Sequence, residues 1–231
     1  IVGYFLFIQL INLCATVINI GLARRRYGYN IYALFRAIRF DREVFDYTKS
    51  LAYSLFFSMF SWVLYYELDT IAIGSFWGAE KVAIYSIGLT LLTFIRNIFG
   101  ILFSPFSARF NHLEGLRDET NLRTLLDKIL ILYAPITMFS LLSVALLAKP
   151  LVFSWVDVSY RSSVPIVQFL VLCNFFAFIS YPLGMLLVAK QRVKEMFFIN
   201  WLIPLIFWIG ILVSKNYFEE RSFAIFKLIS F

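Results

Sequence analysis

Long apolar segments separated by short charged ones dominate the chain. They lie at about 1–23, 51–74, 82–107, 125–148, 164–189 and 196–214. A helix needs about 20 predominantly apolar residues to cross a hydrocarbon core about 30 Å thick. The pattern therefore predicts an all-α fold, a polytopic transmembrane helix bundle of about six spans.

A polar connector at 24–50 separates the first predicted span from the others. Within it Ile31, Leu34, Phe35 and Ile38 recur at helical spacing, and the charged residues fall largely elsewhere. This spacing predicts an amphipathic helix at 30–46 that lies on the membrane surface. We expect residues 1–23 to belong to one helical group and 51–231 to another, with 24–50 as the linker.

Both ends of the sequence are apolar. The first residue is Ile, and the first apolar segment begins at once, without the basic leader or cleavage site of a secretory signal. The last ten residues, 222–231, form an apolar run too short to span. We therefore expect a piece of a longer protein, with a further helix starting at 222–231.

Lysine and arginine are distributed unequally between alternate connections. One side carries Arg24, Arg25, Arg26, Arg36, Arg39, Arg42, Lys49, Arg109, Arg117, Arg123, Lys128, Lys190, Arg192 and Lys194. The other side carries only Lys81, Lys149, Arg161, Lys215 and Arg221. The more basic side is expected to be cytoplasmic, so that the first span runs inward, the linker is cytoplasmic, and the external connections are short.

Composition supports a membrane protein and narrows its chemistry. The chain is 61% hydrophobic and 15% charged, which is far more apolar than an ordinary soluble domain. Its net charge of +7 comes from residues that flank apolar segments, so no nucleic-acid partner is expected. Cys14 and Cys173 lie inside apolar segments and His112 is the only histidine. No metal site, cofactor or histidine-based catalytic group is expected.

Small polar residues recur at helical spacing inside three predicted spans. In the third they are Ser86, Thr90, Thr93, Asn97, Gly100, Ser104 and Ser107, in the second Ser54, Ser58, Ser61, Tyr65 and Asp69, and in the first Gln9, Asn12, Thr16 and Asn19. Such stripes are typical of close helix contacts, and also of helices that surround a water-filled cavity. The amides favour the second interpretation, because an amide in hydrocarbon is costly unless partnered or hydrated.

Two charged residues lie on or beside these polar stripes. Arg96 lies near mid-depth of the predicted third span, where a cation is costly and indicates a functional site unless a nearby carboxylate or carbonyl cluster pairs with it. A guanidinium presents a planar fork of donors that suits a diphosphate. Asp69 continues the second stripe near its external end, where solvation, pairing with an arginine and coupling to an ion gradient all remain open.

Three segments resemble the C-terminal lobe of the polysaccharide flippases, the O-antigen and capsule type of the multidrug/oligosaccharidyl-lipid/polysaccharide exporter superfamily. The segments read YYELDTIAIGSFWGAEKVAIYSIG at 65–88, SPFSARFNHLEG at 104–115 and LLVAKQRVKEMFFINWLIPLIF at 186–207. The resemblance covers residues 45–230. It implies two six-helix lobes around a central cavity with alternating access, in which residues 1–23 end the N-terminal lobe and 51–231 form most of the C-terminal one.

The resemblance also implies a function in the bacterial cytoplasmic membrane. Members move an undecaprenyl-diphosphate-linked oligosaccharide to the periplasmic leaflet for cell-surface polysaccharide biosynthesis. Arg96 matches their basic cavity residues and is the only basic residue well inside one of the six predicted spans. The expected substrate-binding residues are Arg96, Asn97, Thr93, Asp69, Tyr65 and Asn12. The expected partners are the lipid-linked oligosaccharide, membrane lipid, a proton or sodium ion for coupling, and the rest of the N-terminal lobe.

Three other classes of protein remain as alternatives. A drug or small-molecule exporter of the same superfamily would expose a more acidic, aromatic pocket to a cation, which the mid-depth Arg96 disfavours. A membrane-embedded glycan-processing enzyme would show clustered catalytic carboxylates at a membrane face. The acidic loop with Glu114, Asp118 and Glu119 is instead predicted to be a solvated segment that caps a helix. A structural subunit would not require Arg96.

Overall fold

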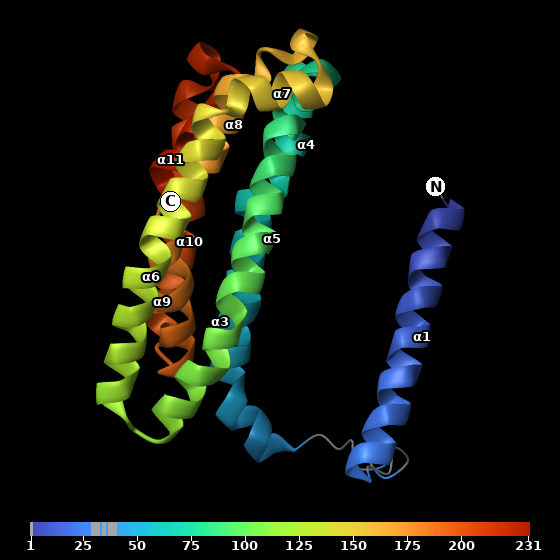
Figure 1. The fold of residues 1–231 in the computed structure, drawn as a ribbon, viewed down its shortest axis with the longest axis vertical. Helices are drawn as coiled ribbons and strands as arrows, with labels where there is room; N and C mark the ends of the chain where they lie inside the picture. Colours follow the sequence, from blue (N-terminus) through green and yellow to red (C-terminus); the bar gives the residue numbers. More distant parts are fainter. Residues whose placement is uncertain (1, 29–32, 34–35, 37–40) are drawn as a thin grey trace. The chain divides into compact units, whose positions relative to one another are not determined.

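The computed structural model describes residues 2–28, 33, 36 and 41–231. Every regular element in these residues is a helix, which confirms the predicted all-α class (Figure 1). Most of the predicted surface helix at 30–46 lies outside the described residues; its last part, from Arg42, is the start of α3. The chain divides into two compact units, Ile1–Lys49 and Ser50–Phe231.

The helices follow one another with short connections. They are α1 (Val2–Tyr27), α3 (Arg42–Tyr66), α4 (Leu68–Trp77), α5 (Ala79–Gly115), α6 (Glu119–Leu146), α7 (Ala148–Val156), the 3-10 helix η1 (Val158–Tyr160), α8 (Ser163–Leu172), α9 (Ala177–Ala189), α10 (Val193–Phe218) and α11 (Arg221–Ser230). Within the second unit, the axes of α5, α6 and α10 are roughly parallel, with α5 running opposite to the other two, and α7 lies across one end (Figure 1).

Four of the described helices are long and apolar enough to cross a membrane. They are Leu6–Arg26, Ala79–Gly115, Glu119–Leu146 and Lys194–Phe218. The pair α8 and α9, bent by 45°, makes a fifth if it counts as one broken span. The second predicted span, 51–74, is divided at Glu67 into α3 and α4 and is not in this set, so the count of six stays a prediction.

Turn chemistry explains where several helices end. Gly78 separates α4 from α5 with φ 87° and ψ −179°, a backbone region open essentially to glycine alone. Asp118 begins α6, where its carboxylate accepts from the Asn121 N–H at 3.0 Å, which confirms the capping role predicted for this loop. Its hydrogen bonds with the Asn121 side chain and backbone hold the pKa of Asp118 below its usual range.

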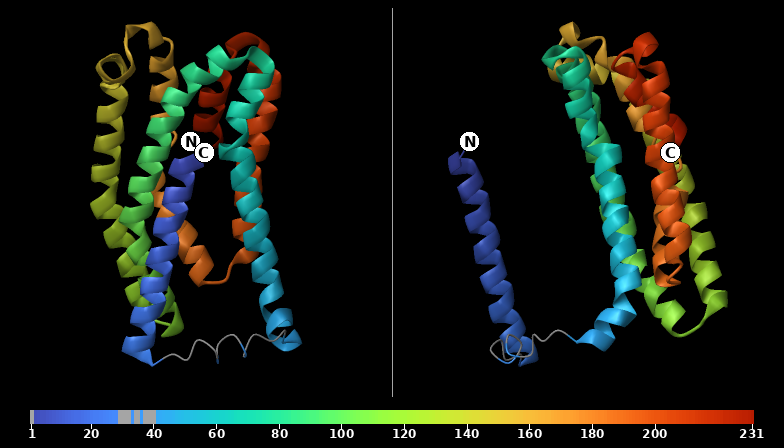
Figure 2. Two further views of the ribbon diagram at one scale, coloured as in Figure 1. Left: turned by 90° about the vertical axis from the view of Figure 1, so that its right-hand side faces the viewer. Right: turned by 180° about the vertical axis from the view of Figure 1, so that it is seen from behind.

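The core of the second unit forms on both sides of α5. One buried cluster joins α5 to α6, α7, α8 and α9, and the other joins α5 to α3, α4, α8, α10 and α11. In Figure 2, α11 (red) lies beside α10 (orange), against which it packs after a sharp turn. At Gly210 of α10 an added Cβ would lie 2.0 Å from Phe226 Cδ1 of α11, so glycine permits this close approach.

Candidate functional site

The interruption at Glu67 leaves backbone acceptors at the end of α3. The last hydrogen bond of the helix runs from the Glu67 N–H to the Val63 carbonyl, at 3.0 Å. The carbonyls of Leu64 and Tyr65 therefore lack a helical partner, as the last carbonyls of a helix do. The Trp208 indole of α10 donates to the Leu64 carbonyl at 3.0 Å. The Tyr65 carbonyl accepts from an ammonium group of α11.

That ammonium group belongs to Lys227, which forms a buried ion pair with Asp69. Both side chains are 0% exposed. The Lys227 Nζ donates to Asp69 Oδ2 and, at 2.7 Å, to the Tyr65 carbonyl. The Tyr85 hydroxyl of α5 donates to the same Asp69 Oδ2 at 2.6 Å. Asp69 thus connects α4 to both α5 and α11.

The two oxygens of the Asp69 carboxylate have different surroundings. Oδ2 accepts both the Lys227 and the Tyr85 hydrogen bonds. Oδ1 is fully buried and has no hydrogen-bond partner among the described residues. Because an unpartnered carboxylate oxygen in a buried site is costly, this atom is the one unsatisfied acceptor of the pair.

Aromatic rings surround the Lys227 ammonium. Their centroids lie 4.9 Å away for Tyr65, 5.2 Å for Tyr66 and 4.7 Å for Phe207. The faces of aromatic rings carry partial negative charge and attract cations within about 6 Å. A cation site is thus formed by the three rings, the Tyr65 carbonyl and the Asp69 carboxylate. The Lys227 ammonium of the protein itself occupies it.

Two further contacts hold α11 in register with this site. The Tyr65 hydroxyl donates to the Lys227 carbonyl at 2.9 Å. At the start of α11, Lys81 of α5 pairs with Glu219 at 2.5 Å and Glu220 at 2.9 Å. Hydrogen bonding to Lys81 lowers the pKa of Glu219.

Arg96 of α5 also lies close to this cluster. Its guanidinium carbon is 3.6 Å from the centroid of the Tyr66 ring. The Tyr181 hydroxyl contacts the Arg96 carbonyl at 3.5 Å. No ion pair of Arg96 with a carboxylate occurs among the described residues, so Tyr66 is the aromatic face that stabilises this charge.

The polar stripe of α5 lies on the surface of the second unit. Thr90, Thr93, Asn97 and Ser104 are exposed. The opposite side of the helix, with Tyr85, Leu92, Ile95, Phe99 and Phe103, is buried in the core. At 3.6 residues per turn, Arg96 falls between the buried side and the polar stripe. The other stripe residues, Ser86, Gly100 and Ser107, are half-buried. Packing within this unit therefore leaves the middle of the stripe, from Thr90 to Asn97, unoccupied.

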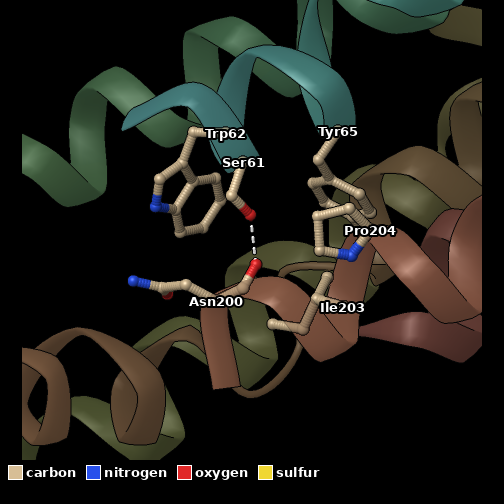
Figure 3. Close-up of a pocket in the computed structure, with 6 residues that line it drawn as sticks. All are labelled: Ser61, Trp62, Tyr65, Asn200, Ile203 and Pro204. Carbon is tan, nitrogen blue, oxygen red and sulfur yellow. Dashed lines mark hydrogen bonds between the residues drawn. The ribbon is translucent and has the colours of Figure 1, made fainter. Parts of the chain in front are cut away.

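The polar stripe of α3 and α4 faces the interior of the unit, unlike that of α5. Ser58, Ser61, Tyr65 and Asp69 are buried, and the last three bond to α10 or α11. Beside Pro204, the Ser61 hydroxyl donates to the carbonyl of Asn200 (Figure 3). Proline lacks an N–H and leaves that carbonyl without its helical donor. This stripe serves helix contact, the first of the two interpretations of such patterns.

The hollow beside this hydrogen bond is small. Its lining residues are Ser61, Trp62, Tyr65, Asn200, Ile203 and Pro204 (Figure 3). It is too small to hold a water molecule, so it is a packing gap between α3 and α10 and not a binding pocket.

The structure brings together only some of the predicted substrate-binding residues. Tyr65 and Asp69 form one buried cluster, and Arg96 reaches it through Tyr66. Thr93 and Asn97 lie on the exposed stripe beside Arg96. Asn12 lies on α1 in the other unit, where its carbonyl accepts from the Thr16 hydroxyl at 2.8 Å.

Sequence reasoning missed Lys227 and Tyr85. Lys227 is a second cation in an apolar setting, besides Arg96, but it lies in the short run 222–231, which is shorter than a span. A lone lysine among Phe226, Leu228 and Ile229 was a signal, because an ionisable residue in an apolar segment calls for a partner. Nothing local in the sequence indicates that this partner is Asp69.

Fold and site together define a helical protein with several helices able to span a membrane and a charged cluster buried among them. Comparisons of the chain with models of protein families, with curated proteins and with solved structures find no match. The resemblance to the polysaccharide flippases therefore stays an expectation from three sequence segments.

Proposed function

We propose that this protein is a transporter and not an enzyme, and that it moves an undecaprenyl-diphosphate-linked oligosaccharide across the bacterial cytoplasmic membrane by alternating access. In this proposal the Ser50–Phe231 unit is most of the C-terminal lobe. The α5 stripe lines one side of the central cavity, and α1 is the last helix of the N-terminal lobe.

One observation carries the proposal: helix packing within its own unit leaves the middle of the α5 polar stripe exposed, at Thr90, Thr93 and Asn97. Thr93 and Asn97 expose an hydroxyl and an amide at the middle of a 37-residue helix. Facing lipid, the Asn97 amide would lack partners, and an unpartnered amide in an apolar medium costs about 2–7 kcal/mol. A water-filled cavity removes that cost.

Arg96 supplies the charge that an anionic carrier lipid requires. It lies next to the stripe, near the middle of α5, and is only partly buried. Since its positive charge has an aromatic partner and no carboxylate among the described residues, the guanidinium keeps donors available for phosphate oxygens. A cationic drug would be repelled at this position, which favours the flippase over the drug exporter.

The test is complementation of a flippase-deleted bacterium with the full-length gene, with surface polysaccharide as the readout. Arg96→Ala is expected to lower surface polysaccharide at least about tenfold, the effect of losing roughly 1.4 kcal/mol of binding to the transported state. Protein levels in the membrane are compared by immunoblot.

Arg109→Ala is the matched control, because Arg109 is an exposed arginine on the same helix. It is expected to restore surface polysaccharide as the parent does. Failure of the parent gene to complement would refute the proposed cargo. Normal polysaccharide with Arg96→Ala at equal protein levels would remove Arg96 from the mechanism.

A further inference from the structure

The buried ion pair of Asp69 and Lys227 is not explained by a contribution to folding stability alone. Taking two charges out of water costs several kcal/mol per ion, and replacing such a pair with apolar residues is often neutral or stabilising. In membrane proteins, ionisable groups buried among helices mark ion pathways and proton relays. The cluster therefore calls for a role beyond holding α11 in place.

We propose that Asp69 is a proton-binding site of this protein and that the proton binds at Oδ1. Oδ2 already accepts from Lys227 and from Tyr85, whereas Oδ1 is buried and no described residue donates to it. A proton from water forms an O–H bond at Oδ1 and breaks no bond in the chain. Lys227 stays an ammonium, so the pair changes from net charge zero to +1.

The surroundings of Asp69 fit a proton better than a larger cation. The Lys227 ammonium already occupies the space between the carboxylate, the Tyr65 carbonyl and the aromatic rings. A metal ion would need several of these same oxygens at once, while a proton needs only the free one. The exposed Glu67, two residues away at the break between α3 and α4, is a carboxylate through which water can deliver it.

The other charged and titratable groups that face the pair come from three parts of the fold. They are Tyr65, Tyr66 and Glu67 at the end of α3, Tyr85 and Arg96 on α5, and Cys173 at the end of α8. Besides Lys227, the cluster has a second positive charge, Arg96 of α5, whose guanidinium contacts the Tyr66 ring of α3. Proton binding would add to the positive charge of this cluster.

Protonation has a structural consequence for α11. The attraction between Lys227 and Asp69 is the charged link between α11 and α4, and a neutral carboxyl would weaken it. α11 would then be held by the Tyr65 hydroxyl and by the Lys81 pairs at its start. That this change drives transport rests on the proposed function, whereas the proton site itself does not.

The experiment is infrared difference spectroscopy of the purified full-length protein in lipid nanodiscs, titrated between pH about 8 and 5, where exposed carboxylates remain largely ionised. The parent is expected to gain the C=O stretching band of a buried carboxylic acid as the pH falls. Asp69→Asn is expected to lose that band completely. Glu67→Gln, which removes the neighbouring exposed carboxylate, is expected to keep it.

A second variant tests whether loss of the band in Asp69→Asn comes from misfolding. Asp69→Asn combined with Lys227→Met removes both charges together and is expected to fold without the band. A parent without the band, or a band that persists in either Asp69 variant, overturns the proposal. The band is read without cargo, so its presence in a protein that fails complementation would leave the proton site standing and remove only the flippase function.

Discussion

The hydrogen bond between Ser61 and Asn200 shows how one residue offsets a defect in a neighbouring helix. Pro204 leaves the carbonyl of Asn200 without its helical donor, and the Ser61 hydroxyl of α3 fills the vacancy. The same compensation occurs within α5. Pro105 leaves the carbonyl of Ile101 without its helical donor, and the Ser104 hydroxyl donates to this carbonyl at 3.2 Å. Polar side chains in this bundle thus satisfy the backbone as well as contributing to polar stripes.

Ser61→Ala should destabilise the fold, because it leaves the part-buried Asn200 carbonyl without a donor. The expected loss is about 1–3 kcal/mol of unfolding free energy, measured by chemical unfolding in detergent micelles. Ser75→Ala is the control, since the Ser75 hydroxyl is exposed and bonds only within its own helix, to Ala72. Equal losses for the two variants would contradict the role assigned to Ser61.

At the scale of elements, α5 organises the second unit through three different faces. One is buried in both core clusters, one carries the polar stripe, and a third is apolar and exposed at Phe94, Ile98 and Ile101. Helix α11 is the opposite case, because five of its 10 residues are buried and it packs against α8 and α10. Its position depends on the glycine at 210 as well as on Lys227.

Gly210→Ala should separate α11 from α10. The new Cβ would lie 2.0 Å from Cδ1 and 2.6 Å from Cγ of Phe226, so the ring and its helix must move. Overpacking of this kind costs about 1–3 kcal/mol, which a lowered thermal midpoint in micelles would report.

Gly100→Ala is the control for this substitution. A Cβ at Gly100 of α5 meets nothing within 4 Å, and alanine favours a helix over glycine by about 1 kcal/mol. We therefore expect no loss of stability at position 100. A Gly210→Ala protein as stable as the parent would contradict the close packing of α10 and α11.

At the scale of the whole molecule, the polar and apolar faces of α5 should differ in their access to water. Cysteines at Thr93 and Asn97 are expected to react with a membrane-impermeant thiol reagent in the active, full-length protein, since these positions are predicted to line a cavity. Cysteines at Phe94 and Ile101, which are 62% and 76% exposed in the isolated unit, are expected to face lipid and stay unlabelled. The native Cys14 and Cys173 are replaced beforehand. Equal labelling of both faces would argue against a water-filled cavity.

Much of the architecture was predictable from periodicity. The helices α5 and α10 enclose the predicted spans 82–107 and 196–214, α6 covers all but the last two residues of 125–148, and the stripe of α5 lies on one face as expected. The break at Glu67 was not predictable, because no proline or glycine marks it. Nor could the pattern separate the exposed stripe of α5 from the buried one of α3, since spacing shows which residues share a face but not what that face contacts.

The sequence by itself determined that this protein is helical and that several of its helices are apolar enough to span a membrane. The reason is local: a run of apolar residues at helical length specifies its own backbone hydrogen bonds and its preferred solvent. Only the tertiary structure decided that Lys227 meets Asp69, 158 residues earlier in the chain. Such a pairing depends on how α4, α5 and α11 pack together, and no local pattern encodes the free oxygen that this packing leaves on Asp69.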